Sequence, residues 1–375
     1  MTSSKPVGIG IVGAGMISEI YLENATTMFD NIRPIGIADL VPERAQDRAD
    51  AFGIEALSID DLIAHPEVEI VVNLTIPAAH AEVAKRAILA GKSAYNEKPL
   101  AITREDAAEL VALATEHGVL IGGAPDTFLG GGLQTGRKAI DDSKIGRPVA
   151  ASAHFLGRGM EMWHPDPHFF FQPGAGPLFD VGPYYVTALA SMLGPVQSVT
   201  GFGHASFAER TVTADGPKKG TTIPVNTQTH IAASLQFQSG AIGSLMASFD
   251  VWEVKERATI LTIYGSEGTL HLPDPNTFGG TVTLVHEHTR ETEEPPITHG
   301  NTGNSRGIGV SDMARALRDG GKPARASGEM ASHVVDIMVS VLEAADAERR
   351  VDLTTTMKRP APLPALPPES GRNPA

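Results

Sequence analysis

A glycine-rich turn near the start of the chain is the first feature whose residue types suggest chemistry. The segment Gly10-Ile11-Val12-Gly13-Ala14-Gly15-Met16-Ile17-Ser18 lies between an apolar run and an amphipathic stretch. Glycines in such a place allow a tight turn and let a pyrophosphate approach the N–H groups of the next helix. Ser18 replaces the usual third glycine or alanine and is still small. The pattern predicts dinucleotide contacts from Gly13, Gly15, Met16 and Ile17.

An acidic residue follows at a spacing that supports this interpretation. Asp39 ends the second apolar run, 21 positions after Ser18, where a carboxylate can accept hydrogen bonds from the adenosine ribose hydroxyls. Its alternative role is to cap the helix that begins at Pro42. Because a carboxylate repels a 2′-phosphate, NAD is the expected cofactor, while Arg44 leaves NADP open.

Two later segments carry polar residues at the ends of apolar runs. Thr75-Ile76-Pro77 and His80 follow the run 70–74, and Glu97-Lys98-Pro99 follows the run 93–96. Ligands of parallel sheets bind at the carboxyl ends of the strands. The sequence therefore predicts cofactor contacts from Thr75, Pro77, His80, Glu97 and Lys98. The alternatives are a strand end without a ligand and, for Lys98, a solvated surface charge.

The elements that position these residues alternate in the way expected of an α/β fold. Between residues 7 and 122, apolar runs at 7–12, 32–38, 70–74, 93–96 and 119–122 predict parallel strands, and amphipathic stretches at 42–52, 78–90 and 103–117 predict helices. The later chain favours a sheet-rich domain with a hairpin that turns at Ser239-Gly240. Helical patterns around 309–318 and 329–348 are expected to cover one face of that second sheet.

The length of 375 residues exceeds what one ordinary core holds. We expect a Rossmann dinucleotide-binding domain over 1–124, an α+β substrate-binding and oligomerisation domain over 125–359, and a loose proline-rich tail over 360–375.

Composition excludes several function classes. A net charge of −14 without a basic run argues against nucleic acid and anionic membrane surfaces as partners. The absence of cysteine excludes disulfides, thiolate catalysis and Cys-ligated metals. No metal site is predicted, since His286 and His288 lack an evident third ligand. With no signal-peptide pattern in the leader and no apolar run of membrane-spanning length, a cytoplasmic location is expected.

Together, these motifs resemble the Gfo/Idh/MocA oxidoreductases. The matching segments are Gly13-Ala14-Gly15, Thr75-Ile76-Pro77 with His80, Glu97-Lys98-Pro99-Leu100, and Gly174-Ala175-Gly176-Pro177-Leu178-Phe179-Asp180-Val181-Gly182. The resemblance implies a C-terminal domain with a large open mixed, mainly antiparallel sheet, a homo-oligomer (dimer or tetramer), and sugar or polyol substrates. It also implies that Lys98 is the catalytic lysine and Asp180 the substrate-binding aspartate.

The sequence departs from the family pattern four residues after Asp180, where Tyr184 replaces the usual acid/base histidine. A tyrosine has an ordinary pKa near 10, so it needs a neighbouring cation, and Lys98 is one candidate. Alternatively, Lys98 itself moves the proton, or a nearby histidine does. Trp163 and His164 are expected to contact substrate, because a ring face covers sugar C–H groups and an imidazole bonds hydroxyls.

The expected activity is hydride transfer between a nicotinamide cofactor and a sugar, polyol or sugar derivative, with Lys98, Asp180 and Tyr184 as the catalytic set. Two alternatives stay open. One is a glycosidase that uses bound NAD for a transient oxidation, and the other is a non-catalytic NAD- or sugar-binding regulatory protein.

Overall fold

A computed structural model describes residues 5–253, 258–319 and 323–366. The chain divides into two compact units. The N-terminal unit comprises residues 1–129 and 303–335, and the C-terminal unit comprises residues 130–302 and 336–375. The first four residues of the leader and the last nine of the predicted tail lie outside the described residues. The domain boundaries predicted at residues 124 and 359 stay predictions.

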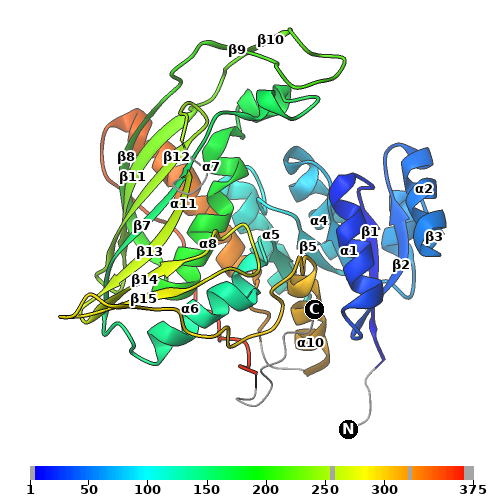
Figure 1. The fold of residues 1–375 in the computed structure, drawn as a ribbon. Helices are drawn as coiled ribbons and strands as arrows, with labels where there is room; N and C mark the ends of the chain where they lie inside the picture. The colour runs from blue at the N-terminus through cyan, green and yellow to red at the C-terminus, as the bar shows by residue number, and fades with distance from the viewer. Residues whose placement is uncertain (1–4, 254–257, 320–322, 367–375) are drawn as a thin grey trace. The chain divides into compact units, whose positions relative to one another are not determined.

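The N-terminal unit is built on a six-stranded parallel sheet in the order β3-β2-β1-β4-β5-β6 (Figure 1). Its strands are β1 (Val7–Val12), β2 (Ile32–Ala38), β3 (Glu55–Ala56), β4 (Ile70–Asn73), β5 (Ser93–Asn96) and β6 (Ile121–Gly123). The predicted α/β class and parallel strands are confirmed. The strand order reverses beside β1, whose neighbours are β2 and β4. Ligands of open parallel sheets bind at the carboxyl edge of such a switch point.

Helices connect these strands. They are α1 (Met16–Thr27), α2 (Pro42–Phe52), α3 (Ile59–Ala64), α4 (His80–Leu89) and α5 (Arg104–Glu116), and a 3₁₀ turn, η1 (Pro77–Ala79), precedes α4. The predicted capping box is present, because the Thr103 hydroxyl accepts a hydrogen bond from the Asp106 N–H at 3.1 Å. Strand β1 is buried along its whole length, as expected where helices cover both faces of a sheet.

One predicted helix packs elsewhere than expected. The pattern around 309–318 forms α10 (Ile308–Asp319), but α10 contacts β2 and β6 of the N-terminal unit, so its predicted place on the second sheet is wrong. The fit is close, since a side chain added at Gly122 would meet Met313 and one added at Gly309 would meet the Tyr95 ring. Helical periodicity identifies an apolar face but not the sheet that this face covers.

The C-terminal unit contains a nine-stranded mixed sheet in the order β16-β15-β14-β13-β7-β12-β11-β8-β17. The strands are β7 (Pro148–Leu156), β8 (Val196–His204), β11 (His230–Phe237), β12 (Ile242–Ser248), β13 (Thr259–Gly265), β14 (Gly268–Leu272), β15 (Thr283–His286), β16 (Thr292–Glu293) and β17 (Val351–Asp352). Among the described strands of this sheet, only β7 and β12 pair in parallel. The predicted hairpin is β11–β12, with Ser234 opposite Ser244.

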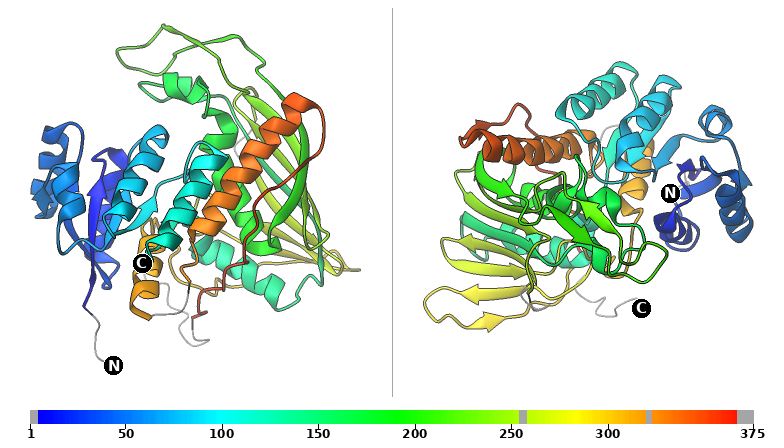
Figure 2. Two further views of the ribbon diagram at one scale, coloured as in Figure 1. Left: turned by 180° about the vertical axis from the view of Figure 1, so that it is seen from behind. Right: turned by 90° about the horizontal axis from the view of Figure 1, so that it is seen from above.

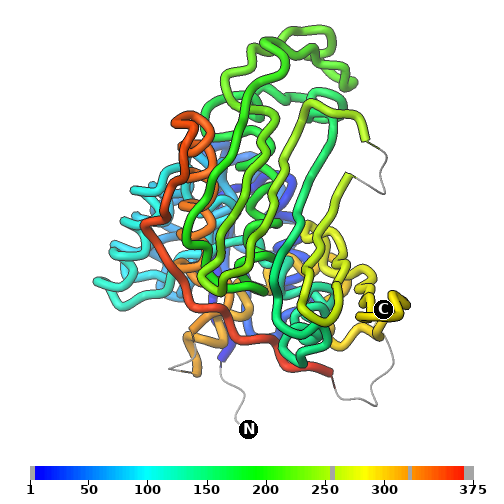
Figure 3. Tube along the Cα trace, turned by 90° about the vertical axis from the view of Figure 1, so that its left-hand side faces the viewer, coloured from blue at the N-terminus to red at the C-terminus, as the bar shows by residue number. Residues whose placement is uncertain are grey.

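Helices of this unit cover one face of the sheet. Helix α6 (Gly131–Asp141) contacts β14, α7 (Gly176–Asp180) contacts β12, and α8 (Gly182–Leu193) contacts β7. Figure 2 shows the sheet edge-on and from above, and Figure 3 views its other face, where no helix lies in front of β7, β8, β11 and β12. The predicted open, mainly antiparallel sheet is confirmed. Strands β9 (Glu209–Thr211) and β10 (Thr222–Pro224) form a separate two-stranded arm.

Helix α11 (Gly328–Ala347) confirms the last predicted helix. The chain that follows is not loose over its described part, because the Leu363 N–H donates to Gln134 Oε1 at 2.8 Å and the Leu366 N–H donates to the Thr298 carbonyl at 2.8 Å. Among the described residues, no helix combines the length and apolarity needed to cross a membrane.

Candidate dinucleotide and active site

The glycine turn adopts a backbone that other residues would not tolerate at its first position. Gly13 has φ +106°, and a Cβ there would lie 2.7 Å from the Leu74 carbonyl oxygen. Around a Cβ built at Gly15, in contrast, no protein atom of the described residues lies within 4 Å. The turn thus packs against the end of β4 on one side and leaves room on the other. A pyrophosphate needs that room.

Helix α1 begins directly at this free space. Its N-cap is Gly15, which offers no side chain to the first N–H groups of the helix, including those of Met16 and Ile17. Ser18 is fully buried and donates to the Gly15 carbonyl at 2.7 Å, so the serine that replaces glycine stabilises the turn. Free N–H groups and the helix dipole favour an anion at this end.

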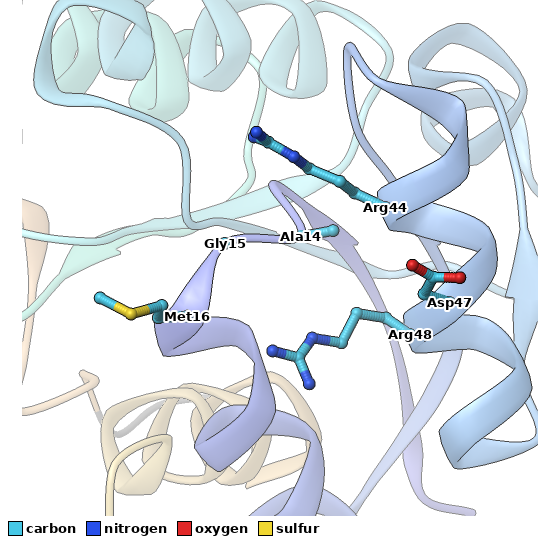
Figure 4. Close-up of a pocket in the computed structure, with 6 residues that line it drawn as sticks. All are labelled: Ala14, Gly15, Met16, Arg44, Asp47 and Arg48. Atoms are coloured by element: carbon cyan, nitrogen blue, oxygen red, sulfur yellow. The ribbon is translucent and has the colours of Figure 1, made fainter. Parts of the chain in front are cut away.

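A pocket of about 550 Å³ opens beside the turn (Figure 4). It is lined by Ala14, Gly15, Met16, Arg44, Asp47 and Arg48. The two arginines come from α2 and extend toward the glycine turn from the opposite side of the pocket. This charge distribution suits a phosphorylated ligand.

Asp39 lies immediately after β2 and holds the turn in place. Its Oδ2 accepts the Ala14 N–H at 2.7 Å and its Oδ1 accepts the Val41 N–H at 2.9 Å. The carboxylate therefore braces the glycine turn and holds Val41, whereas the N-cap of α2 is Val41 and has no side-chain cap bond, so the alternative capping role of Asp39 is not observed. Each oxygen retains a lone pair for a ribose hydroxyl.

The two arginines differ in their partners. Arg48 donates to Glu19 of α1 at 2.9 Å, so part of its charge is neutralised. Arg44 makes no side-chain ion pair or hydrogen bond among the described residues. Arg44 is thus the cation of this pocket with the greatest capacity to bind an added phosphate.

Two buried asparagines organise the carboxyl edge of the central strands. Asn73 and Asn96 pair across β4 and β5, and the Asn73 amide donates to Asn96 Oδ1 at 3.0 Å. Asn96 also donates to the Leu100 carbonyl at 2.9 Å, and the Thr75 hydroxyl donates to Asn73 Oδ1 at 2.6 Å. Both loops that follow these strands are therefore held by side chains that the strands themselves supply.

His80 lies beneath these loops and is fully buried. Its Nδ1 lies 2.6 Å from the Pro99 carbonyl oxygen and its Nε2 lies 3.0 Å from the Thr75 carbonyl oxygen. Burial lowers the pKa of the imidazole below its ordinary value. Any contribution of His80 to cofactor binding acts through the loops it holds.

Glu97 connects the lysine segment to α1. Its Oε1 accepts the Tyr21 hydroxyl at 2.8 Å and its Oε2 accepts the Lys98 N–H at 2.9 Å. Burial, followed by the charge of Glu97, raises the pKa of Tyr21 well above its ordinary value, so Tyr21 stays a neutral donor. Lys98 itself is half-buried.

A buried carboxyl group, that of Asp126, lies near Glu97. Asp126 Oδ2 accepts the N–H groups of Gly307 at 2.9 Å and Gly309 at 3.0 Å, at the start of α10. Burial raises the pKa of Asp126 to about 6, and the charge of Glu97 adds to this shift while the two backbone bonds oppose it. The carboxyl of Asp126 thus titrates much closer to neutrality than an ordinary aspartate.

In the C-terminal unit, Asp180 is the last residue of α7 and Tyr184 lies in the first turn of α8. Gly176, with φ +78°, begins α7 in close contact with the Gln228 carbonyl. Asp180 is half-buried and Tyr184 is 9% exposed. The motif that the sequence singled out thus forms a tight connection between two short helices.

The aromatic segment before α7 is compact. His164 lies edge-on to Trp163 and to Phe170, with ring centroids 5.6 and 5.3 Å away. Trp163 is 63% exposed, so its ring face is accessible within this unit. The Asp166 N–H donates to His164 Nδ1 at 3.1 Å, which leaves Nε2 as the donor of the neutral ring.

A buried ion cluster anchors this segment. Arg210 of β9 donates to Glu161 Oε1 at 2.9 Å and to Asp250 Oδ1 at 2.9 Å, and the guanidinium is almost fully buried. The Thr229 hydroxyl donates to Asp250 at 2.7 Å. Because Glu161 lies two residues before Trp163, the cluster holds the aromatic segment to the sheet. Sequence spacing did not reveal these residues.

Tyr21, Asn73, Asn96 and Asp126 were also missed from the sequence. Asn73 and Asn96 each end an apolar strand, and a polar residue at that place in consecutive strands is a usable signal. Tyr21 and Asp126 carry no such signal, since their partners come from distant segments. Among the described residues, no group of three His, Cys, Asp or Glu side chains lies close enough to hold a metal ion.

Comparison with known proteins agrees with this geometry. Residues 7–123 match the family model described as "Oxidoreductase family, NAD-binding Rossmann fold", and residues 133–271 match the GFO/IDH/MocA C-terminal domain. The chain belongs to the Gfo/Idh/MocA family. Its N-terminal unit thus carries the family's NAD-binding Rossmann fold, and the predicted family and nicotinamide cofactor are confirmed.

Relatives within the Gfo/Idh/MocA family act on sugars and polyols. The 1,5-anhydro-D-fructose reductase of Ensifer adhaerens is 27% identical over 268 residues, which cover 70% of this chain and 74% of the relative. An inositol 2-dehydrogenase/D-chiro-inositol 3-dehydrogenase of Lactiplantibacillus plantarum is 31% identical over 154 residues, 40% of this chain. That alignment spans only 44% of the relative's length, and another curated relative is covered over 55%.

A solved structure of the Gfo/Idh/MocA fold covers nearly the whole chain. Levoglucosan dehydrogenase in complex with NADH and L-sorbose has a TM-score of 0.78 at 21% identity, and the match covers 94% of this chain and 100% of that one. At this identity, the likeness shows the fold. Both units of the chain therefore have the fold of a sugar dehydrogenase that was solved with NADH.

Proposed function

We propose that this chain is an NAD-dependent oxidoreductase that transfers a hydride between nicotinamide and a sugar, polyol or sugar derivative. The observation that carries the proposal is the position of the lysine segment at the carboxyl end of β5, where the Tyr21 hydroxyl of α1 donates to Glu97 at 2.8 Å. The glycine turn and Asp39 lie at the same edge. When bound there, the nicotinamide supplies the hydride acceptor or donor.

Three side chains have proposed roles in the chemistry. Lys98 donates a proton to the substrate oxygen when a carbonyl is reduced and accepts one when an alcohol is oxidised, or it polarises that oxygen. Asp180 accepts a hydrogen bond from a neighbouring substrate hydroxyl. Tyr184 is the proposed proton relay, and it needs a cation nearby because tyrosine has an ordinary pKa near 10. The motif match to the family supports the first two roles.

Further side chains are proposed to bind the two ligands. Asp39 takes the adenosine ribose hydroxyls, and the N–H groups of Met16 and Ile17 take the pyrophosphate. Trp163 offers an exposed ring face to sugar C–H groups, and His164 offers a donor to a hydroxyl. The remaining proposed cofactor contacts are Gly13, Gly15, Thr75, Pro77, Glu97 and Lys98, whereas the buried His80 acts through the loops it holds.

We also propose that the chain forms a homo-oligomer through the uncovered sheet face. Strands β7, β8, β11, β12 and β13 contain no Asp, Glu, Lys or Arg, although 20% of the chain is charged. Phe202, Ala232, Met246 and His154 pair in one row across this face, and Phe202 is 74% exposed. Interface cores are depleted of charge in this way. A cytoplasmic location stays a prediction from the sequence.

A substrate screen tests the proposed activity. The purified chain is incubated with sugars and polyols in the presence of NAD or NADP, and the absorbance of the reduced cofactor is followed. We expect accumulation of NADH with at least one substrate. Cleavage of a glycoside without accumulation of NADH would instead indicate a transient oxidation. Binding of NADH without turnover across the panel would indicate a regulatory protein.

A lysine variant tests the assigned chemistry. Lys98→Ala should reduce kcat by at least about 100-fold, the usual contribution of a general acid or base, while the Kd for NADH stays within about threefold. Lys144→Ala removes an exposed lysine of the C-terminal unit and serves as the matched control. Equal turnover in the Lys98 and Lys144 variants would refute the role of Lys98.

A further inference from the structure

His80 joins the two loops that follow β4 and β5. Its Nε2 faces the Thr75 carbonyl oxygen at 3.0 Å, and its Nδ1 faces the Pro99 carbonyl oxygen at 2.6 Å. The side chain has no exposed surface, so water cannot take the place of either partner. Both contacts are therefore made to atoms of the protein backbone.

The number of protons on the ring decides whether both contacts are favourable. A carbonyl oxygen only accepts hydrogen bonds, and a neutral imidazole carries a single N–H donor. In the neutral form one ring nitrogen would turn its lone pair toward a carbonyl oxygen. Only the imidazolium donates to both loops at once. The shorter distance to Pro99 indicates that the neutral ring keeps its proton on Nδ1 and loses the bond to Thr75.

The surroundings of His80 act on its charge in opposite directions. Burial lowers the pKa of the ring and is the largest influence. The two carbonyl oxygens and the carboxylate of Glu97 raise the pKa, and the ammonium of Lys98 lowers it. The free imidazole has an ordinary pKa near 6.5, and burial moves the change of charge of His80 to a pH below that value.

We propose that His80 is a positioning residue that ties the Thr75 loop (residues 75–77) to the lysine segment (residues 97–99) as an imidazolium and releases the Thr75 loop when neutral. The inference rests on the proposed function in one respect, namely that the Thr75 loop borders the bound dinucleotide. The asparagine pair holds the same loops from within the sheet, which leaves His80 as the titrating part of this network.

The direction of the pH effect follows from proton linkage. If the dinucleotide binds better to the tied loops, it binds preferentially to the protonated state. Its affinity then falls as the pH rises through the pKa of His80. One hydrogen bond is at stake, so we expect the Kd for NADH to be roughly three- to tenfold lower at pH 5 than at pH 8.

The protonation of His80 can be measured directly in the wild-type protein. Histidine-selective ¹⁵N NMR distinguishes a protonated from an unprotonated ring nitrogen, and His80→Gln assigns the signal. In a titration from pH 8 to pH 5, we expect only Nδ1 to be protonated at the start and the protonated fraction of Nε2 to rise as the pH falls. This readout needs neither turnover nor a substrate, so it stays informative if the proposed oxidoreductase activity fails. A ring that stays in one neutral tautomer over this range would overturn the proposal.

Titrations of NADH fluorescence then test the consequence. His80→Gln keeps a donor but has one charge state at every pH, so its Kd should depend less on pH than the wild-type Kd does. His117→Gln removes an exposed histidine at the end of α5 and should retain the wild-type dependence. Thermal melts confirm that each variant is folded at the pH values used. If His80→Gln follows the wild-type curve, His80 is only a packed residue and the proposal is wrong.

Discussion

The carboxylate of Asp39 accepts the backbone N–H of Ala14 at 2.7 Å, which ties the end of β2 to the glycine turn after β1. The two segments are 25 residues apart in sequence. A residue expected to bind ribose therefore also shapes the turn expected to bind pyrophosphate. Substitution of Asp39 is therefore expected to affect both the ribose contact and the pyrophosphate contact.

The two glycines of the turn should respond differently to alanine. Gly13→Ala forces a side chain to φ +106° and against the Leu74 carbonyl, so we expect a loss of about 2 kcal/mol or more in the free energy of unfolding. Gly15→Ala places its Cβ in open space at φ −71°. It should leave stability nearly unchanged and weaken NADH binding by about tenfold or more, because the Cβ fills the pyrophosphate site. Denaturant unfolding and fluorescence titration separate the two effects.

Asp39 and Arg44 should set the preference between NADH and NADPH. Asp39→Ser removes the charge that repels a 2′-phosphate and leaves Arg44 to bind it. We expect a Kd for NADH about tenfold higher, and a ratio of NADPH to NADH affinity that rises by at least that factor. Asp47→Asn, in the same pocket, is the matched control. An unchanged preference in the Asp39 variant would show that this carboxylate does not meet the ribose.

Asp126 should make the stability of the fold depend on pH. Its pKa is about 6 in the folded chain, against an ordinary 3.8, so the folded state holds the proton more tightly than the unfolded state. The resulting stabilisation is complete below about pH 4 and is lost as the pH rises through about 6, with a size on the order of 3 kcal/mol. Asp126→Asn keeps the acceptor for Gly307 and Gly309 without a charge.

Unfolding by denaturant at pH 5 and pH 8 measures this effect. The free energy of unfolding of Asp126→Asn minus that of the wild type should be larger at pH 8 than at pH 5. The reason is that the wild type must ionise the buried carboxyl at pH 8 and the variant has no carboxyl to ionise. Asp30→Asn, at an exposed position, should show no such difference. If the two variants behave alike, the buried carboxyl does not titrate in this range.

The uncovered sheet face should control the oligomeric state. Light scattering coupled to gel filtration should give the wild type a mass that is a multiple of 39.5 kDa. Phe202→Glu introduces a charge into the uncharged face and should shift the mass toward one chain. Leu89→Glu changes an exposed leucine of the N-terminal unit and should keep the wild-type mass. A wild-type monomer would contradict the proposed assembly.

Much of the N-terminal unit was predictable from local pattern. Strands 7–12, 32–38 and 93–96 and helix 42–52 have the bounds that the sequence predicts. Buried parallel strands are short apolar runs, and their ends carry the polar residues that meet a ligand, so Asp39, Thr75 and Glu97 were identifiable. Lys98 was identifiable in the same way, whereas Asp180 was identified only through the resemblance of its motif to the family.

The partners of these residues were not predictable. Tyr21 reaches Glu97 across 76 positions, and Asp126 receives N–H groups from Gly307 across 181 positions. A hydrogen bond between distant segments leaves no periodicity in the sequence, because neither segment needs a particular spacing to its partner. The ion cluster of Arg210, Glu161 and Asp250 could not be predicted from the sequence for the same reason.

The sequence by itself determined the glycine turn, the strand ends and the family, because these depend on residues that are neighbours along the chain. Only the tertiary structure showed that residues 303–335 belong to the unit that begins the chain, that α10 packs against β2 and β6, and that both nitrogens of His80 face carbonyl oxygens. An apolar helix face can pack against any sheet of suitable shape, and a buried histidine can lie beside many different polar groups. The tertiary packing decides which sheet the helix covers and which polar groups the histidine contacts.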